Sequence, residues 1–393
     1  MAERYLIDPD LDFINEVVGL GGSDLKKCYQ CATCSVVCPI SPENKPFPRK
    51  EMIAASWGLK DKLVCNHDIW LCHNCGDCST MCPRGAKPGD VLAAVRSYAI
   101  SDYATPKSLG KMVNDPKKLP ILFGIPVILF AFFAILTTFA GDLFARIFGG
   151  EFWYHTHNGL PLEGIAHSKF ISTWFVDLVF VPLSIWVVVI FAMGLKRFLN
   201  DIHKNALLEG KTEKKELDLK AFLKSIVNVL PTILRHDKFN ECSENKERST
   251  AHMMVLFGFI GLFIVTGIFF LVLYIFHIPG PYSQLNPVKW LANVSGLALI
   301  IGGILMIKSR LSKTDQVTGY KDWYLIGLVL GLGVTGMLTE MSRLAEVEYF
   351  SYFIYLLHLA FVFCLFAYLP FSKLAHLVYR TVAMAYDNYG NRR

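Results

Sequence analysis

Two copies of one cysteine pattern, CYQCATCSVVCP at residues 28–39 and CHNCGDCSTMCP at residues 72–83, decide how the N-terminal part of this chain folds. Each copy reads CxxCxxCxxxCP. Where such a run occurs twice, three cysteines surround one [4Fe-4S] cluster, and the fourth, turned away by the proline, reaches the neighbouring cluster. The spacing therefore predicts two clusters with exchanged fourth ligands. Cluster 1 takes Cys28, Cys31, Cys34 and Cys82, and cluster 2 takes Cys72, Cys75, Cys78 and Cys38.

Two other uses of eight cysteines agree less well with this spacing. Structural zinc prefers two separated CxxC pairs, and a disulfide framework requires an oxidising compartment. The first residues, MAERYLIDPDLDF, lack the basic and apolar regions of a secretory signal. We therefore expect the cysteines to stay in the reducing cytoplasm, where thiolates can bind iron.

The composition indicates a chain that lies largely in a membrane. Of its 393 residues, 53% are hydrophobic and only 18% are charged, and the mean hydropathy is +0.38. The charges gather in the first 118 residues and in a few loops. The net charge of +6 does not indicate a nucleic-acid partner, because the lysines and arginines lie where membrane topology would put them.

The predicted domains are all helical. Helical spacing predicts helices over residues 49–59 and 89–100, so residues 1–104 are expected to form a small ferredoxin-like domain whose helices hold the two cysteine loops together. Residues 105–118 contain four lysines and two prolines, as expected of a linker against anionic lipid headgroups. A six-span membrane domain over residues 119–376 and a cytoplasmic tail over residues 377–393 follow.

Six apolar stretches are each near the roughly 20 residues that cross the hydrocarbon core. They cover residues 119–141, 173–195, 252–276, 290–307, 323–341 and 349–371. The loops on one side contain 24 lysines and arginines, and those on the other contain 4. Because cytoplasmic loops are the basic ones, both termini and the cysteine-rich domain are predicted to be cytoplasmic, at the cytoplasmic (inner) membrane.

A glycine pattern in the fifth span resembles a nucleotide-binding fingerprint. Gly331, Gly333 and Gly336 match GxGxxG, but no strand precedes them and no βαβ unit surrounds them. Close helix packing is the better interpretation.

Four histidines lie at the edges of two spans and are candidate haem ligands, because an imidazole in hydrocarbon is costly without a partner. His252 and His277 are 25 residues apart and would share one helix face, as would His358 and His376, which are five turns apart. The predicted topology pairs His252 with His376 at the cytoplasmic side and His358 with His277 at the far side. This pattern predicts two bis-histidine haems stacked across the bilayer.

Other histidines leave the far-side pair open. His155, His157 or His167, all in the loop over residues 142–172, could replace His277. His203 and His236, in the basic cytoplasmic loop, are expected to be solvated or structural.

Two CxxCxxCxxxCP motifs followed by six spans with paired histidines resemble a fusion of two modules. The first resembles the C-type iron-sulfur component of heterodisulfide reductase, and the second resembles the haem b membrane component of respiratory nitrate reductases. That second family takes two haem ligands from each of two helices. The spacing of His358 and His376 agrees with it, but the position ten residues after His252 is Leu262.

This order of modules is similar to the C-type membrane components of quinone-interacting membrane-bound oxidoreductase (Qmo) complexes of sulfate-reducing bacteria. The resemblance implies an all-α chain with two [4Fe-4S] clusters and two haem b groups, and menaquinone as its membrane substrate. It also implies the flavin and iron-sulfur subunits (A and B) of the same complex as partners, and adenylylsulfate reductase beyond them. The chain would then be a quinone-linked electron-transfer subunit of sulfate respiration, with no catalytic residue for a soluble substrate.

Two rival interpretations remain. One is a heterodisulfide-reductase-type membrane subunit, although paired CCG motifs are absent from the sequence. The other is a passive membrane anchor with no quinone site. If two haems are present, we expect quinone on the far side near His358, where Glu340, Arg343, Glu346 and Glu348 could exchange protons.

Overall fold

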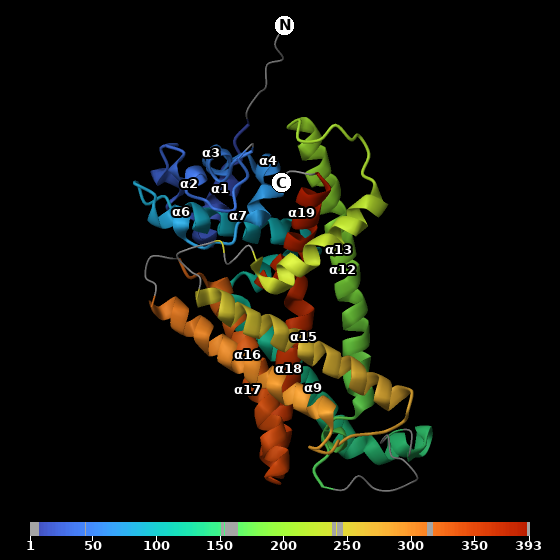
Figure 1. Ribbon diagram of the computed structural model, residues 1–393. Helices are drawn as coiled ribbons and strands as arrows, with labels where there is room; N and C mark the ends of the chain where they lie inside the picture. The colour runs from blue at the N-terminus through green and yellow to red at the C-terminus, as the bar shows by residue number, and fades with distance from the viewer. Residues whose placement is uncertain are drawn as a thin grey trace.

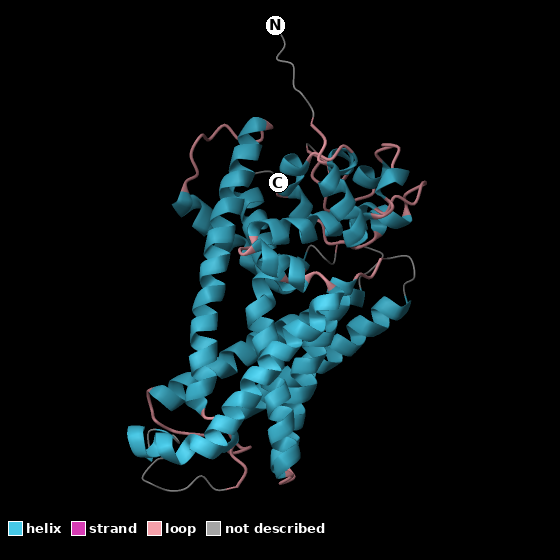
Figure 2. Cartoon of the chain, turned by 180° about the vertical axis from the view of Figure 1, so that it is seen from behind, coloured by secondary structure: helices cyan, strands magenta, loops and turns pink. Residues whose placement is uncertain are grey.

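The computed structural model describes residues 8–43, 45–150, 153, 164–237, 241, 247–312 and 317–390. Helices form the N-terminal head, the long membrane bundle and the C-terminal segment, and the described residues contain no strand (Figures 1 and 2). The all-α fold class expected from the sequence is therefore confirmed.

The head is a set of short helices around one longer helix, α7 (Pro88–Tyr103). Val91, Leu92 and Val95 of α7 are fully buried, so this helix forms the centre of the head core. The helix predicted over residues 49–59 is α3 (Arg49–Ser56), and α7 contains the one predicted over residues 89–100. The remaining helices of the head are α1 (Leu11–Val17), α2 (Thr33–Val36), α4 (Lys60–Val64), α5 (Asp68–Leu71) and α6 (Asp77–Thr80).

Six helices of the described chain are long and apolar enough to cross a membrane, and each contains or overlaps one predicted span. The chain is therefore an integral membrane protein. The second of these helices continues from its predicted end at residue 195 to Leu208. Its 36 residues therefore measure about 54 Å. The six are α9 (Leu119–Phe148), α12 (Thr173–Leu208), α15 (Glu247–Tyr274), α16 (Pro287–Ser312), α17 (Tyr320–Leu344) and α18 (Glu348–Tyr368).

The head rests on helices that follow the membrane spans. The segment expected as a tail forms α19 (His376–Tyr389), which packs on α5 of the head and on α13 (Leu219–Arg235). Figure 1 shows α19 and α13 beside each other, next to the head. Tyr379 of α19 is fully buried, and its ring stacks on that of Trp70 with centroids 5.3 Å apart. The head and the C-terminal helix therefore share one hydrophobic core.

A buried set of charges also joins the head to the membrane domain. Asp68 is fully buried, and it pairs with Lys50 at 2.9 Å and with Lys211, just beyond α12, at 3.2 Å. Burial and then the charge of Asp68 raise the pKa of the neighbouring Glu51 carboxyl above its usual value. The Lys211 side chain is only 5% exposed, and removing one partner of such a buried pair typically costs about 3–5 kcal/mol, so this contact fixes the head in place.

The glycine pattern of the fifth span packs helices together, as predicted. A side-chain carbon at Gly331 would lie 2.2 Å from the Phe361 ring of α18. One at Gly336 would lie 3.1 Å from the ring of His358. Glycine at these positions lets α17 approach α18 closely, and the second of them makes room for a histidine.

Candidate functional site

The four thiols predicted for cluster 1 surround one small cavity. Cys28, Cys31, Cys34 and Cys82 all border it. Burial, and then repulsion from the other three thiols, raises the pKa of Cys34 to about 11. Thiols grouped in this way ionise at neutral pH only beside a strong positive charge, which bound iron supplies. The group therefore has the chemistry of an iron–sulfur site.

The four thiols predicted for cluster 2 are also brought together. Burial first, and then repulsion from Cys72 and Cys75, raises the pKa of Cys38 to about 12. The same causes, with Cys38 among the neighbours, raise the pKa of Cys78. Within the described ranges, no three His, Cys, Asp or Glu side chains are close enough to bind a single metal ion.

Backbone amides point at cysteine sulfurs in both groups. The amide of Ala86 donates to Cys82 Sγ at 3.3 Å, and the amide of Asn74 donates to Cys72 Sγ at 3.3 Å. Such bonds to sulfur are one of the ways in which a protein tunes the potential of a cluster.

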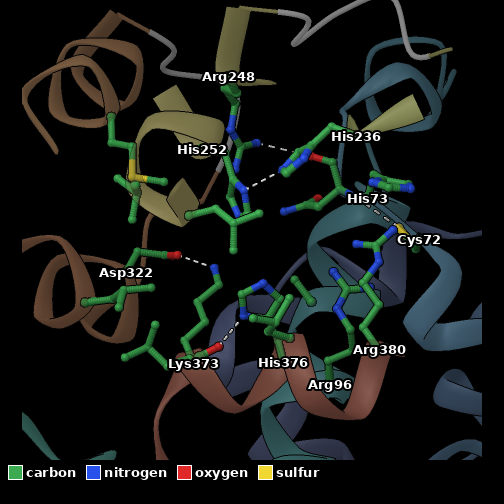
Figure 3. Close-up of a pocket in the computed structure, with 18 of the residues that line it drawn as sticks. Cys72, His73, Arg96, His236, Arg248, His252, Asp322, Lys373, His376 and Arg380 are labelled. Carbon is green, nitrogen blue, oxygen red and sulfur yellow. Dashed lines mark hydrogen bonds and ion pairs between the residues drawn. The ribbon is translucent and has the colours of Figure 1, made fainter. Parts of the chain in front are cut away.

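A cavity of about 230 Å³ separates the cluster 2 loop from the membrane helices (Figure 3). Cys72 and His73 form part of one wall, and His252 of α15 and His376 of α19 also line the cavity. The two imidazole rings are 6.2 Å apart between centroids and inclined at 74°. The structure therefore brings together the two histidines predicted for the cytoplasmic side.

Each of these imidazoles is oriented through its Nδ1 atom. His252 Nδ1 lies 2.8 Å from Nε2 of His236, and His376 Nδ1–H donates to the carbonyl of Lys373 (Figure 3). Burial lowers the pKa of His376 to about 4, so its ring is neutral at pH 7. A hydrogen bond at Nδ1 that fixes the ring and leaves Nε2 for the metal is typical of histidine ligands.

The rest of the cavity suits a flat apolar group that carries carboxylates. Val255, Leu325 and Val329 supply apolar walls. Five cations and a single carboxylate line the same space, and these charged residues are Arg96, Arg248, Arg310, Lys373, Arg380 and Asp322. Haem b has an apolar ring and two propionates, so the residues present fit it.

His376 reaches this position by a route that helical spacing did not predict. The helix that carries His358 ends at Tyr368, and two short 3₁₀ turns that include Pro370 separate it from α19. The two histidines therefore lie on different helices. His236, expected to be solvated or structural, contacts the predicted ligand His252.

At the other end of the bundle, His358 is enclosed between α17 and α18. Its Nδ1 lies 3.0 Å from Thr335 Oγ1, and Gly336 provides space beside its ring. His277, its predicted partner, is exposed in the turn after α15, with a left-handed backbone (φ 53°).

His167 packs against the helix that carries His358. Burial, and then the positive charge of Arg343, lowers the pKa of His167 to about 4. Its ring packs on Tyr355 at 4.6 Å between centroids, and its Nε2 lies 3.0 Å from Ser351 Oγ. The other two alternatives, His155 and His157, lie outside the described residues.

The acids and bases expected near the quinone are of two kinds. Glu340 pairs with Lys289 at 2.5 Å and with Arg343 at 3.1 Å, and all three side chains are partly buried. Glu346 and Glu348 are exposed. Only Glu340 and Arg343 therefore belong to the polar group near His167.

The fold and the cysteine groups define an integral-membrane iron–sulfur protein, and comparison with known proteins supports this class. Residues 24–86 match the family model described as the 4Fe-4S dicluster domain. The C-type subunit of the H(2):CoB-CoM heterodisulfide,ferredoxin reductase of Methanothermobacter marburgensis is 35% identical over 91 residues, which are 23% of this chain and 49% of that protein. The C 2 iron-sulfur subunit of the CoB--CoM heterodisulfide reductase of Methanocaldococcus jannaschii is 35% identical over 107 residues, 25% of this chain and 57% of that protein.

These matches concern one part of the chain. The chain spans about half the length of the relatives that it matches, and no solved structure matches it. The resemblance to the C-type component of heterodisulfide reductase is confirmed for the iron–sulfur part. Residues 24–86 accordingly form a domain of the kind that carries two [4Fe-4S] clusters.

Proposed function

We propose that this chain transfers electrons between menaquinone in the membrane and soluble flavin-containing subunits. The route would use two haem b groups and the two [4Fe-4S] clusters, each of which takes up and gives back one electron when bound. The observation that carries the proposal is the cavity lined by Cys72 of the cluster 2 loop and by His252 and His376. Such a cavity would bring a haem next to a cluster.

The proposed route crosses the molecule in a fixed order. Cys31 of cluster 1 is exposed, so a soluble partner can approach this cluster, whereas Cys72, Cys75 and Cys78 are buried and Cys72 lines the cavity. His252 and His376 would be the axial ligands of the cytoplasmic-side haem, and His358 would be a ligand of the far-side haem. Basic loops favour placing the head in the cytoplasm.

In this proposal the partners are the flavin and iron-sulfur subunits (A and B) of a Qmo-type complex, which serves adenylylsulfate reductase. The order of modules in the sequence supports the assignment. We place the quinone on the far side, where Glu340, Lys289 and Arg343 form a partly buried charged group that can exchange protons. A far-side haem would otherwise have no electron acceptor or donor.

A second candidate function is delivery of electrons to a disulfide-reducing subunit, which the names of the relatives favour. The same clusters and haems would serve it. The soluble subunits that copurify with the chain distinguish the two candidates, because a subunit with paired CCG motifs is expected only for the second.

The function is tested on the purified full-length protein. We expect haem b bands in the reduced-minus-oxidised spectrum and reduction of both haems by a menaquinol analogue. A quinone-analogue inhibitor should shift the visible spectrum of only the haem that depends on His358. A spectrum without haem b bands would leave the passive anchor as the correct interpretation. A shift confined to the haem that depends on His376 would move the quinone site to the cytoplasmic side.

The far-side haem should depend on His167 rather than on His277. Replacing His167 with alanine is expected to remove the second haem b signal, because His167 packs against Tyr355 and Ser351 of the helix that carries His358, whereas His277 is exposed. The matched variant His277→Ala should keep two haems per protein. For both variants, the number of haems per protein is determined from haem content, and the number of haem components is determined by redox titration. Loss of the haem in His277→Ala alone would restore the partner predicted from the sequence.

A further inference from the structure

Three arginines from distant parts of the chain donate to one short stretch of backbone. Arg96 Nη1 of α7 donates to the carbonyl of Ile69 at 2.7 Å, and Arg380 Nη2 of α19 donates to that of Leu71 at 3.1 Å. Arg248 Nη1, in the first turn of α15, donates to the carbonyl of Asn74 at 3.2 Å. These carbonyls flank Cys72, so the head, the third span and the C-terminal helix all hold the cluster 2 loop.

The same three arginines line the cavity between that loop and the two histidines (Figure 3). Among the described residues that line the cavity, the one carboxylate is that of Asp322, which is paired with Arg310 at 3.1 Å and with Lys373. Within this part of the chain, five cationic side chains thus line the cavity with one carboxylate. A cluster of cations in a partly buried space is costly unless anions accompany it.

A guanidinium group has five N–H donors in a planar fork, so it can bind a carbonyl on one edge and a carboxylate on another. A lysine ammonium group is a compact point charge and lacks this planar arrangement of donors. Three guanidinium groups that share a cavity with a pair of oriented imidazoles would thus receive a ligand with an apolar body and carboxylates at one edge.

We propose that Arg96, Arg248 and Arg380 form a carboxylate-binding site that holds the haem propionates and links them to the backbone of the cluster 2 loop. This inference rests on the proposed function, because it requires a haem between His252 and His376. The arginines would fix the orientation of the haem relative to the cluster. Their positive charge would also favour the reduced haem, so its midpoint potential would be raised.

The test compares haem with its dimethyl ester, in which both carboxylates are neutral. The full-length chain is produced without haem and titrated with either compound, and binding is followed by the spectrum of the haem that depends on His376. In the unsubstituted chain, esterification should weaken binding at least about tenfold. In the double variant Arg248→Gln/Arg380→Gln, the two compounds should bind within about twofold of each other.

A matched control separates this effect from a general loss of arginine. Arg197 of α12 donates to the carbonyl of Tyr103 but does not line the cavity, so Arg197→Gln should keep the full preference for free haem. If the double variant does not fold, as judged by circular dichroism, Arg380→Gln alone should show an intermediate preference. The midpoint potential of this haem should fall in each cavity variant.

The possible failures are distinguishable. Suppose that the unsubstituted chain binds haem, and that the double variant prefers free haem over the ester as strongly as the unsubstituted chain does. The arginines then do not bind the propionates, and the inference is wrong. If the unsubstituted chain binds neither compound, the proposed function fails and the inference fails with it.

Discussion

Replacing His376 with alanine is expected to remove one of two haem b signals completely and to leave the other unchanged. His376 lines the cavity between the cluster 2 loop and the membrane helices. Its ring lies 6.2 Å from that of His252 between centroids, and the carbonyl of Lys373 orients it. Alanine offers no axial ligand, so the cytoplasmic-side haem would lose half of its ligation. Haem content should fall from two to one per protein, and redox titration should show one remaining component.

His203 provides the control for this prediction. It is also a buried histidine beside α19, but its Nδ1 lies 2.9 Å from the hydroxyl of Tyr386 and it does not line the cavity. His203→Ala should therefore keep both haems. If both signals persist in His252→Ala and in His376→Ala, the ligand assignment is wrong.

Replacing Cys82 with alanine should destroy or convert the cluster built on Cys28, Cys31 and Cys34, although Cys82 belongs to the second motif. The reason is that these four thiols border one cavity, whereas Cys38 lies with the thiols of the other group. Electron paramagnetic resonance of the reduced protein should show one altered cluster signal, and iron content should fall. The effect is expected to be large because a cubane needs a ligand at each iron.

Cys65 is the matched thiol for this experiment, because it lies between the two motifs and borders neither group. Cys65→Ala should leave both cluster signals intact. An alteration confined to the cluster built on Cys72, Cys75 and Cys78 in the Cys82 variant would overturn the exchange of fourth ligands.

Much of this architecture is predictable because its signals are local. Each motif places its cysteines within 11 residues, and each span is one apolar run, so spacing and hydropathy suffice. The same holds for Gly336, whose packing role follows from its place inside a span. The end of α12 was not predictable in this way, since the helix continues through polar sequence that the head covers.

The contacts around the cavity beside the cluster 2 loop join residues far apart in the sequence. Arg380 meets the carbonyl of Leu71 across 309 positions, and Arg248 meets that of Asn74 across 174. No periodicity in a single sequence encodes such a meeting. The sequence left open whether His236 is solvated or structural, and its contact with His252, 16 positions away, is visible only in the structure.

The buried ion pairs of Asp68 with Lys50 and Lys211 have a consequence for the rate of the whole process. Some redox proteins carry electrons on a tethered domain that swings between docking positions, and solvent viscosity then slows them. Here the head is fastened to the end of a membrane helix by Asp68 and Lys211, whose side chains are both almost completely buried. Electrons would therefore hop along a stationary row of centres, and transfer between head and membrane should be insensitive to added glycerol.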